Sequence, residues 1–99
     1  MDTQAEIVDF LTTHKQFLKE KYSISKIGLF GSFARNEMTK DSDVDLLIEI
    51  DKGTQNIYDL KTALKNYLST AFKRDVDLAR IKYLKPYAKK EILRDALYV

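Results

Sequence analysis

Apolar side chains recur every three or four residues through the first fifth of the chain. This spacing predicts an amphipathic helix over residues 3–21, whose apolar stripe would cover one face of a sheet. Thr3 and Glu6 form the Thr-x-x-Glu pattern of a capping box, which marks the start of that helix. The apolar positions are Ile7, Phe10, Leu11, Phe17 and Leu18.

Three short runs of strand-forming residues follow this helix. They predict β-strands over residues 24–30, 44–50 and 74–80, of which the second is the most apolar. With only three strands, one edge of the sheet would be exposed or covered by a partner.

Two further helices complete the predicted elements. After a loop at 51–54, apolar residues at helical spacing predict a long helix over residues 56–72. Pro86, the only proline, suits the first turn of a final helix that would run to about Leu97. Helices that interleave with strands predict a small α/β domain, with helices packed on one sheet and residues 1–99 in a single domain.

Composition narrows the chemistry that this domain can perform. The chain has no cysteine, which excludes disulfides, zinc–thiolate sites and thiol nucleophiles. His14 is the only histidine, so a site with several histidines is excluded, and we interpret His14 as a structural residue on the apolar stripe. Any bound metal should therefore be a hard, oxygen-liganded cation such as Mg²⁺.

The charge distribution adds little to the picture. The net charge is +2, which is too small to argue for nucleic acid, and the basic C-terminal residues are typical of a solvated helical face. These residues are Lys82, Lys85, Lys89, Lys90 and Arg94. No apolar run approaches the roughly 20 residues that span a bilayer, and the N-terminus does not have the pattern of a signal peptide, so we expect a cytoplasmic protein.

A glycine-serine pair stands at the end of the first predicted strand. Gly31 permits a sharp turn and a close approach of the backbone to a ligand. The Ser32 hydroxyl and the following amides could donate to phosphate oxygens, and Arg35 could add a charge-assisted contact. A plain strand-to-helix turn capped by Ser32 would give the same residues, so this pair alone is weak evidence.

Two carboxylates stand at the start of the second predicted strand. Asp43 and Asp45 are one residue apart, so an extended backbone would point both to the same face. Like charges held so close repel each other unless a cation lies between them, and Mg²⁺ commonly joins such carboxylates to substrate phosphates. The alternative is a solvated, acidic strand entry.

A third carboxylate lies in the third predicted strand. We expect Asp77 to complete a triad with Asp43 and Asp45 if the second and third strands are neighbours. A carboxylate between apolar neighbours in mid-strand is unusual, because burying it unpaired is expensive. Asp75 competes for this role, and we prefer Asp77 because it lies deeper in the strand.

These segments together resemble the signature of the DNA polymerase β-like nucleotidyltransferase superfamily, and more closely the minimal nucleotidyltransferase (MNT) proteins of prokaryotes. The segments are Gly31-Ser32-Phe33-Ala34-Arg35, Ser42-Asp43-Val44-Asp45-Leu46 and Val76-Asp77-Leu78. The C-terminal residues from Leu84 also resemble the usual MNT ending, so the likeness covers nearly the whole chain. The resemblance implies a small mixed sheet of the polymerase β-like fold.

The resemblance also implies roles for the matching positions. Gly31 and Ser32 would hold the phosphates of ATP, with Arg35 and Ser42 completing the nucleotide-binding set. Asp43 and Asp45 would bind two Mg²⁺ ions. Asp77 would ligate one of these ions and take the proton from the attacking hydroxyl.

One position departs from the family pattern. The family often has glycine after the Ala-Arg pair, where this chain has Asn36. Asparagine is the non-glycine residue that best tolerates a left-handed backbone, so we expect the turn to survive.

The acceptor is suggested only by the resemblance, because MNT proteins are typically paired with a HEPN-domain toxin. An MNT antitoxin adenylylates a toxin tyrosine, binds the toxin, or does both. We favour a protein adenylyltransferase; the alternatives are a non-catalytic binding antitoxin and a nucleotidyltransferase acting on a small molecule such as an aminoglycoside. Nucleic acid is not expected as a direct substrate. Tyr83, Tyr87 and Tyr98 with nearby lysines could form the partner surface.

Overall fold

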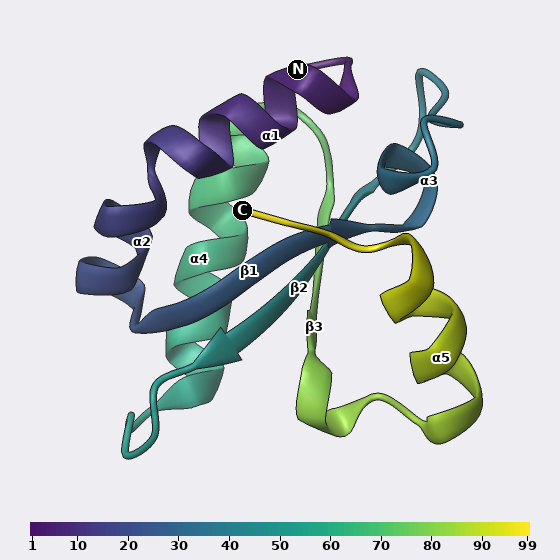
Figure 1. Cartoon of the computed structure of the whole chain (residues 1–99). Helices are drawn as coiled ribbons and strands as arrows, with labels where there is room; N and C mark the ends of the chain where they lie inside the picture. The colour runs from purple at the N-terminus through teal and green to yellow at the C-terminus, as the bar shows by residue number, and fades with distance from the viewer.

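The computed structural model describes all 99 residues, and its centre is a four-stranded sheet (Figure 1). The strands are β1 (Ile24–Phe30), β2 (Val44–Ile50), β3 (Val76–Arg80) and β4 (Leu97–Tyr98), in the order β3-β2-β1-β4. β1 is antiparallel to both β2 and β4, whereas β2 and β3 are parallel. The sheet is therefore mixed, which confirms the predicted α+β class.

Helices cover the two faces of this sheet unequally. α1 (Gln4–Thr13), α2 (Lys15–Tyr22) and α4 (Ile57–Phe72) lie on one side of the strands, and α5 (Pro86–Asp95) lies on the other (Figure 1). The main core forms under the first three helices, where sixteen buried apolar residues cluster. No polar or charged residue is buried anywhere in the chain. The face beneath α1, α2 and α4 is thus purely apolar.

The predicted helix over residues 3–21 is interrupted, so that part of the prediction was wrong. Thr3 caps α1 by accepting a hydrogen bond from the Glu6 N–H at 3.1 Å, but the helix stops at Thr13. His14 adopts φ −98° and ψ 7°, and its Nδ1 bonds the Phe10 carbonyl at 2.8 Å. The backbone bonds nevertheless continue across the junction, because the His14 N–H also bonds the Phe10 carbonyl, at 3.0 Å, and the Leu18 N–H bonds the His14 carbonyl at 2.9 Å. The His14 ring also stacks on Phe10 at 3.9 Å, in agreement with a structural role.

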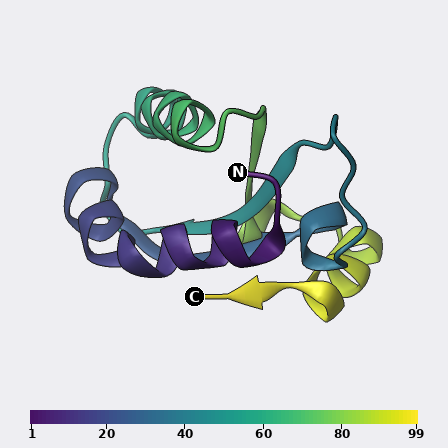
Figure 2. The ribbon, with the colours of Figure 1, turned by 90° about the horizontal axis from the view of Figure 1, so that it is seen from above.

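The C-terminal prediction was also wrong, because the final helix does not reach Leu97. α5 ends at Asp95, and Ala96 takes an extended conformation that leads into β4. β4 pairs Tyr98 with Gly28 and covers part of the outer edge of β1, opposite β3 (Figure 2). A two-residue strand is too short to produce an alternating pattern, so periodicity could not reveal it.

Smaller differences concern the ends of elements. The third strand begins at Val76 rather than at residue 74, and α4 begins at Ile57 because Asn56 has a left-handed backbone, φ 54°. A short 3₁₀ helix, η1 (Ile81–Tyr83), follows β3. None of the helices is long and apolar enough to cross a lipid bilayer.

Candidate active site

The three predicted carboxylates lie at the start of β2 and in the neighbouring strand β3. Val44 and Leu46 are fully buried in the main core, so Asp45, which stands between them in β2, points to the other face of the sheet. Asp43 lies directly before β2 and is close enough to raise the pKa of Asp45. In the parallel pairing of β2 with β3, Asp45 stands directly opposite Asp77. The register therefore places Asp77 beside Asp45, on the same face.

Gly31 is shaped around the Asp45 carboxylate. β1 ends at Phe30, whose register partner is Asp45, and the single-turn helix α3 (Gly31–Ala34) begins at once. Gly31 has φ +70°, and a Cβ added there would overlap Oδ2 of Asp45 and lie 3.0 Å from its Cγ. Only glycine fits both the left-handed backbone and this close approach. Gly31 thus gives Asp45 the space that it occupies.

The electrostatic environment of Asp45 is strongly negative. Its pKa is raised from 3.8 to about 6, first by partial burial, then by the charge of Asp77 and then by that of Asp43. The Arg35 guanidinium opposes this rise. The carboxylates therefore act on one another electrostatically, and a cation beside Asp45 would relieve the repulsion.

The three carboxylates are the type of ligand that Mg²⁺ prefers, but their side chains are not close enough together to hold the ion as they stand. All three side chains offer oxygen ligands, Asp45 stands opposite Asp77, and Gly31 lets the backbone come close to Asp45. No group of three or more His, Cys, Asp or Glu side chains is arranged closely enough to hold a metal ion. Asp43 and Asp77 are exposed, so their side chains are free to turn toward Asp45. The backbone brings the three carboxylates near one another, and Asp43 and Asp77 would bind the same cation as Asp45 only after their side chains rotate toward it.

The argument that singled out Asp77 needs correction. Asp77 is exposed, so the cost of burying an unpaired carboxylate does not explain its presence. Its register opposite Asp45 is the stronger reason. Asp77 raises the pKa of Asp45, whereas Asp75 is not among the groups that do so. The structure therefore gives a better ground than depth in the strand for preferring Asp77 to Asp75.

The other predicted nucleotide-binding residues differ in their surroundings. Ser32 lies half-buried in the first turn of α3, beside Gly31. Arg35 is exposed and makes a 3.5 Å contact with Glu37. The Ser42 hydroxyl accepts a hydrogen bond from the Thr39 N–H at 2.8 Å, which closes the turn before Asp43. The Ser42 hydroxyl is thus already bonded within this turn, and its contact with a nucleotide stays a prediction.

The turn that departs from the family pattern survives as expected. Asn36 has φ +57°, the left-handed conformation that asparagine tolerates better than other non-glycine residues. The Glu37 N–H bonds the Ser32 carbonyl at 2.8 Å across this turn. The segment after α3 is therefore closed without a glycine at position 36.

Predicted site residues line three separate hollows. One, of about 360 Å³, lies where the end of β1 meets α5 and is lined by Gly31, Arg35 and Arg94 among others. A second, of about 470 Å³, has only polar lining residues and includes Asp43. A third, of about 280 Å³, includes Asp77 beside Lys61 and Lys65 of α4. Larger hollows of about 540 and 570 Å³ contain none of the predicted site residues, so chemistry rather than size identifies the site. Arg94 was predicted only as part of a solvated face, since no local motif links it to Gly31.

Comparison with known proteins identifies the family of this chain. The sequence model of the nucleotidyltransferase domain family matches residues 11–99. The chain belongs to this family. Like its relatives it is an enzyme, a nucleotidyltransferase, which confirms the predicted superfamily and reaction class.

Several relatives match along the whole chain. The protein adenylyltransferase MntA of Thermococcus cleftensis is 36% identical over all of this chain and 98% of its own length. A Methanocaldococcus jannaschii protein, provisionally named a protein adenylyltransferase, is 40% identical over the full length of both chains.

Solved structures share the fold at lower identity. A structure provisionally named a minimal nucleotidyltransferase superposes with a TM-score of 0.79 and 24% identity, covering 96% of this chain and 94% of that one. A toxin–antitoxin structure with AMP-PNP matches with a TM-score of 0.69 and 20% identity, over 88% of this chain and 69% of that one. These likenesses support the minimal nucleotidyltransferase fold.

Proposed function

We propose that this nucleotidyltransferase transfers AMP from ATP to a tyrosine hydroxyl of a partner HEPN-domain toxin, with Mg²⁺ as cofactor, and so acts as an antitoxin. The observation that carries the proposal is the register of Asp45 with Asp77, with Asp43 and Asp77 both raising the pKa of Asp45 and Gly31 built against it. Two findings support the acceptor class: a full-length relative is named a protein adenylyltransferase, and a toxin–antitoxin structure with this fold contains AMP-PNP.

The chemistry follows from the placement of the side chains. Gly31 and Ser32 lie at the start of α3, where free backbone N–H groups and a hydroxyl can hold the β- and γ-phosphates. Asp43 and Asp45 would hold Mg²⁺, which when bound neutralises charge at the α-phosphate. The acceptor oxygen forms a bond to the α-phosphorus as the bond to the β-phosphate oxygen breaks and pyrophosphate leaves. Asp77 takes the proton of the acceptor hydroxyl.

The partner would meet a surface that carries exposed aromatic side chains. Tyr83 and Tyr87 are 67% and 76% exposed, and they belong to η1 and the first turn of α5. The Arg80 guanidinium lies 4.9 Å from the Tyr83 ring centroid and Lys82 lies 5.1 Å from it. Exposed tyrosines with cations are typical of interface residues, so we assign the toxin contact to this surface.

Label transfer tests the proposed reaction. The protein is incubated with α-³²P-ATP, Mg²⁺ and the candidate toxin, with Asp77→Asn as the test variant and Asp75→Asn as its matched control. We expect Asp77→Asn to lower the rate of toxin labelling by about 10²-fold or more, because it removes a proton acceptor. Asp75→Asn should stay near wild type.

Other outcomes would change the assignment. Toxin neutralisation with no label on the toxin would replace the proposal with a binding antitoxin. Label on an aminoglycoside rather than on protein would favour a small-molecule acceptor. Equal loss in Asp75→Asn and Asp77→Asn would overturn the role given to Asp77.

A further inference from the structure

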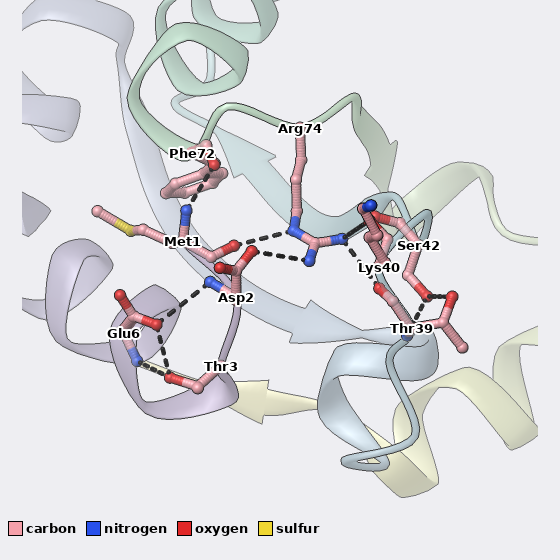
Figure 3. Close-up of polar contacts among 9 residues, drawn as sticks. All are labelled: Met1, Asp2, Thr3, Glu6, Thr39, Lys40, Ser42, Phe72 and Arg74. Carbon is pink, nitrogen blue, oxygen red and sulfur yellow. Dashed lines mark hydrogen bonds and ion pairs between the residues drawn. The ribbon is translucent and has the colours of Figure 1, made fainter.

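One arginine outside the predicted site joins three segments of it. Arg74 lies between α4 and β3, its side chain is only 8% exposed, and its guanidinium makes five hydrogen bonds (Figure 3). Three of these go to carbonyls of one turn: Thr39 at 3.1 Å, Lys40 at 3.2 Å and Ser42 at 2.8 Å. The other two go to the Met1 carbonyl and the Asp2 carboxylate.

The turn that Arg74 holds leads directly into the carboxylate pair. Asp43 follows Ser42, and no hydrogen bond or ion pair to its own carboxylate fixes Asp43. Its position is therefore set by the backbone on either side. On one side Arg74 binds the Ser42 carbonyl, and on the other the Val44 N–H donates to the Asp75 carbonyl at 2.9 Å.

The same arginine also belongs to the segment that carries the third carboxylate. Asp77 lies three residues after Arg74, on β3. A guanidinium that grips the 39–42 turn therefore links the strand of Asp77 to the loop that delivers Asp43. The Arg74 guanidinium carbon also lies 5.1 Å from the Phe33 ring centroid, next to Ser32. One side chain thus contacts the turn that includes Ser42 and the helix that includes Ser32, and it belongs to the segment that leads to Asp77.

We propose that Arg74 is a positioning residue for the metal–nucleotide site. Its guanidinium holds the turn 39–42 against β3 and so sets Asp43 relative to Asp77; this inference rests on the proposed function. Carbonyl oxygens that converge on one point repel each other unless a donor lies between them, so the turn depends on its central cation. A lysine ammonium has three donors around one atom and cannot span the turn, Met1 and Asp2 as the planar guanidinium does.

Two variants distinguish the contact of Arg74 with the turn 39–42 from its contact with the N-terminal residues. Arg74→Lys keeps the charge but loses the planar set of donors, whereas Asp2→Ala removes only the N-terminal partner. Binding of Mn²⁺ with AMP-PNP is measured by calorimetry, and transfer is measured against Mg²⁺ concentration. We expect Arg74→Lys to raise the Mg²⁺ concentration for half-maximal transfer by about 10- to 100-fold, because the backbone that positions Asp43 would shift, and a misplacement of about 1 Å in a site can cost 10²-fold. Mn²⁺–AMP-PNP binding should weaken in parallel.

The control gives the opposite pattern. Asp2→Ala should lower the unfolding temperature slightly and leave the Mg²⁺ dependence unchanged. An equal shift in both variants would mean that Arg74 merely stabilises the fold, and a folded Arg74→Lys with wild-type Mg²⁺ dependence would overturn the proposal. If wild-type protein neither bound Mn²⁺–AMP-PNP nor transferred AMP, the proposed function itself would fail.

Hydrogen exchange tests the turn in the wild-type protein, without any variant. The Thr39 and Ser42 N–H groups bond within the turn, and Val44 N–H bonds Asp75. If Arg74 holds the turn, these three amides should exchange slowly and together, although Thr39 is exposed. Rapid exchange of the Thr39 and Ser42 amides beside a protected Val44 would show that the turn opens by itself and would refute the positioning role.

Discussion

The two faces of the sheet are made by alternate residues of the same strands, yet they have opposite character. Toward α1, α2 and α4, β2 presents Val44, Leu46 and Ile48, all fully buried. Toward the opposite face it presents Asp45, with Asp77 of β3 beside it and Asp43 directly before the strand. The first face contributes apolar burial, whereas the second concentrates like charges that raise the pKa of Asp45.

The comparison indicates that residues important for stability and residues important for the reaction are direct neighbours along the same strand. Neighbouring residues of a strand point to opposite faces, so substitutions at adjacent positions should produce different losses. The separation is incomplete at the start of β2, where Arg74 and the turn 39–42 serve both the fold and the carboxylates. Substitutions can therefore test which residues of the sheet affect stability, which affect AMP transfer, and which affect both.

The largest effect is expected on the acidic face. Asp45→Asn should lower AMP transfer by more than about 100-fold, because loss of even an outer partner of metal ligands costs 10- to 100-fold. The unfolding temperature at neutral pH should not fall, since the substitution removes a charge that its neighbours repel. Rates and melting curves of the same preparations check both parts. A parallel loss of stability would show that the acidic face also supports the fold.

The adjacent residue on the apolar face should behave in the opposite way. Leu46 is fully buried in the core, so Leu46→Ala should lower the free energy of unfolding by about 2–5 kcal/mol. The transfer rate per folded molecule should stay near wild type when it is assayed well below the melting temperature. Urea unfolding gives the first value and the label-transfer assay gives the second. Loss of activity in fully folded Leu46→Ala would show that the faces are coupled.

A substitution at Gly31 should affect both the stability of the fold and the position of Asp45. A Cβ at Gly31 would overlap the Asp45 carboxylate, and the φ of +70° adds strain. Gly31→Ala should therefore impair transfer by an order of magnitude or more and also destabilise the fold by about 1–2 kcal/mol. Gly53→Ala is the matched control, since Gly53 has φ +82° but no atom within 4 Å of an added Cβ. The control should lose similar stability and retain full activity; equal activity losses would refute the contact with Asp45.

Local patterns in the sequence predicted the central strands well. β1 and β2 have the predicted bounds, because each is a full run of strand-forming residues. The strand period of two also places Asp45 on the face opposite Val44 and Leu46, whereas the role of Asp43 and Asp45 as metal ligands stays a prediction. The α1–α2 break was missed because His14 lies on a continuing apolar stripe, and backbone hydrogen bonds from the His14 and Leu18 N–H groups continue across the break.

Features that depend on distant contacts could not be predicted from local patterns. Tyr98 pairs with Gly28, and a Cβ at Gly28 would lie 2.7 Å from the Tyr98 ring, a fit between residues seventy positions apart. Asp77 was selected on burial, although its register with Asp45 is what places it. Arg74 gave no signal at all, because its partners are backbone carbonyls of residues more than thirty positions away.

The smallest expected effect is the dependence of stability on pH. The pKa of Asp45 in the folded protein is about 6, above its ordinary value of 3.8, so between these values the folded state binds more protons than the unfolded state. Without added metal, the stability contributed by protonated Asp45 is present at about pH 4 and is lost as the pH rises through about 6. The change should be modest, since solvent screens a partly exposed carboxyl. Glu6 has the opposite sign: hydrogen bonds from Asp2 and Thr3 lower its pKa, so its contribution is lost only as the pH falls below about 4.5.

Urea unfolding in EDTA, repeated between pH 4.5 and 8, separates the two carboxylates. Wild type should lose stability between about pH 4.5 and 6 and then level off, whereas Asp45→Asn should show a flatter profile over that range and Glu6→Gln should keep the wild-type slope. If Asp45→Asn and wild type lost stability in parallel, the repulsion among the carboxylates would be too weak to distinguish the two faces. A flattened profile of Asp45→Asn would instead show that repulsion among the carboxylates lowers the stability of the metal-free protein at neutral pH. Burial of the apolar face must then offset this repulsion.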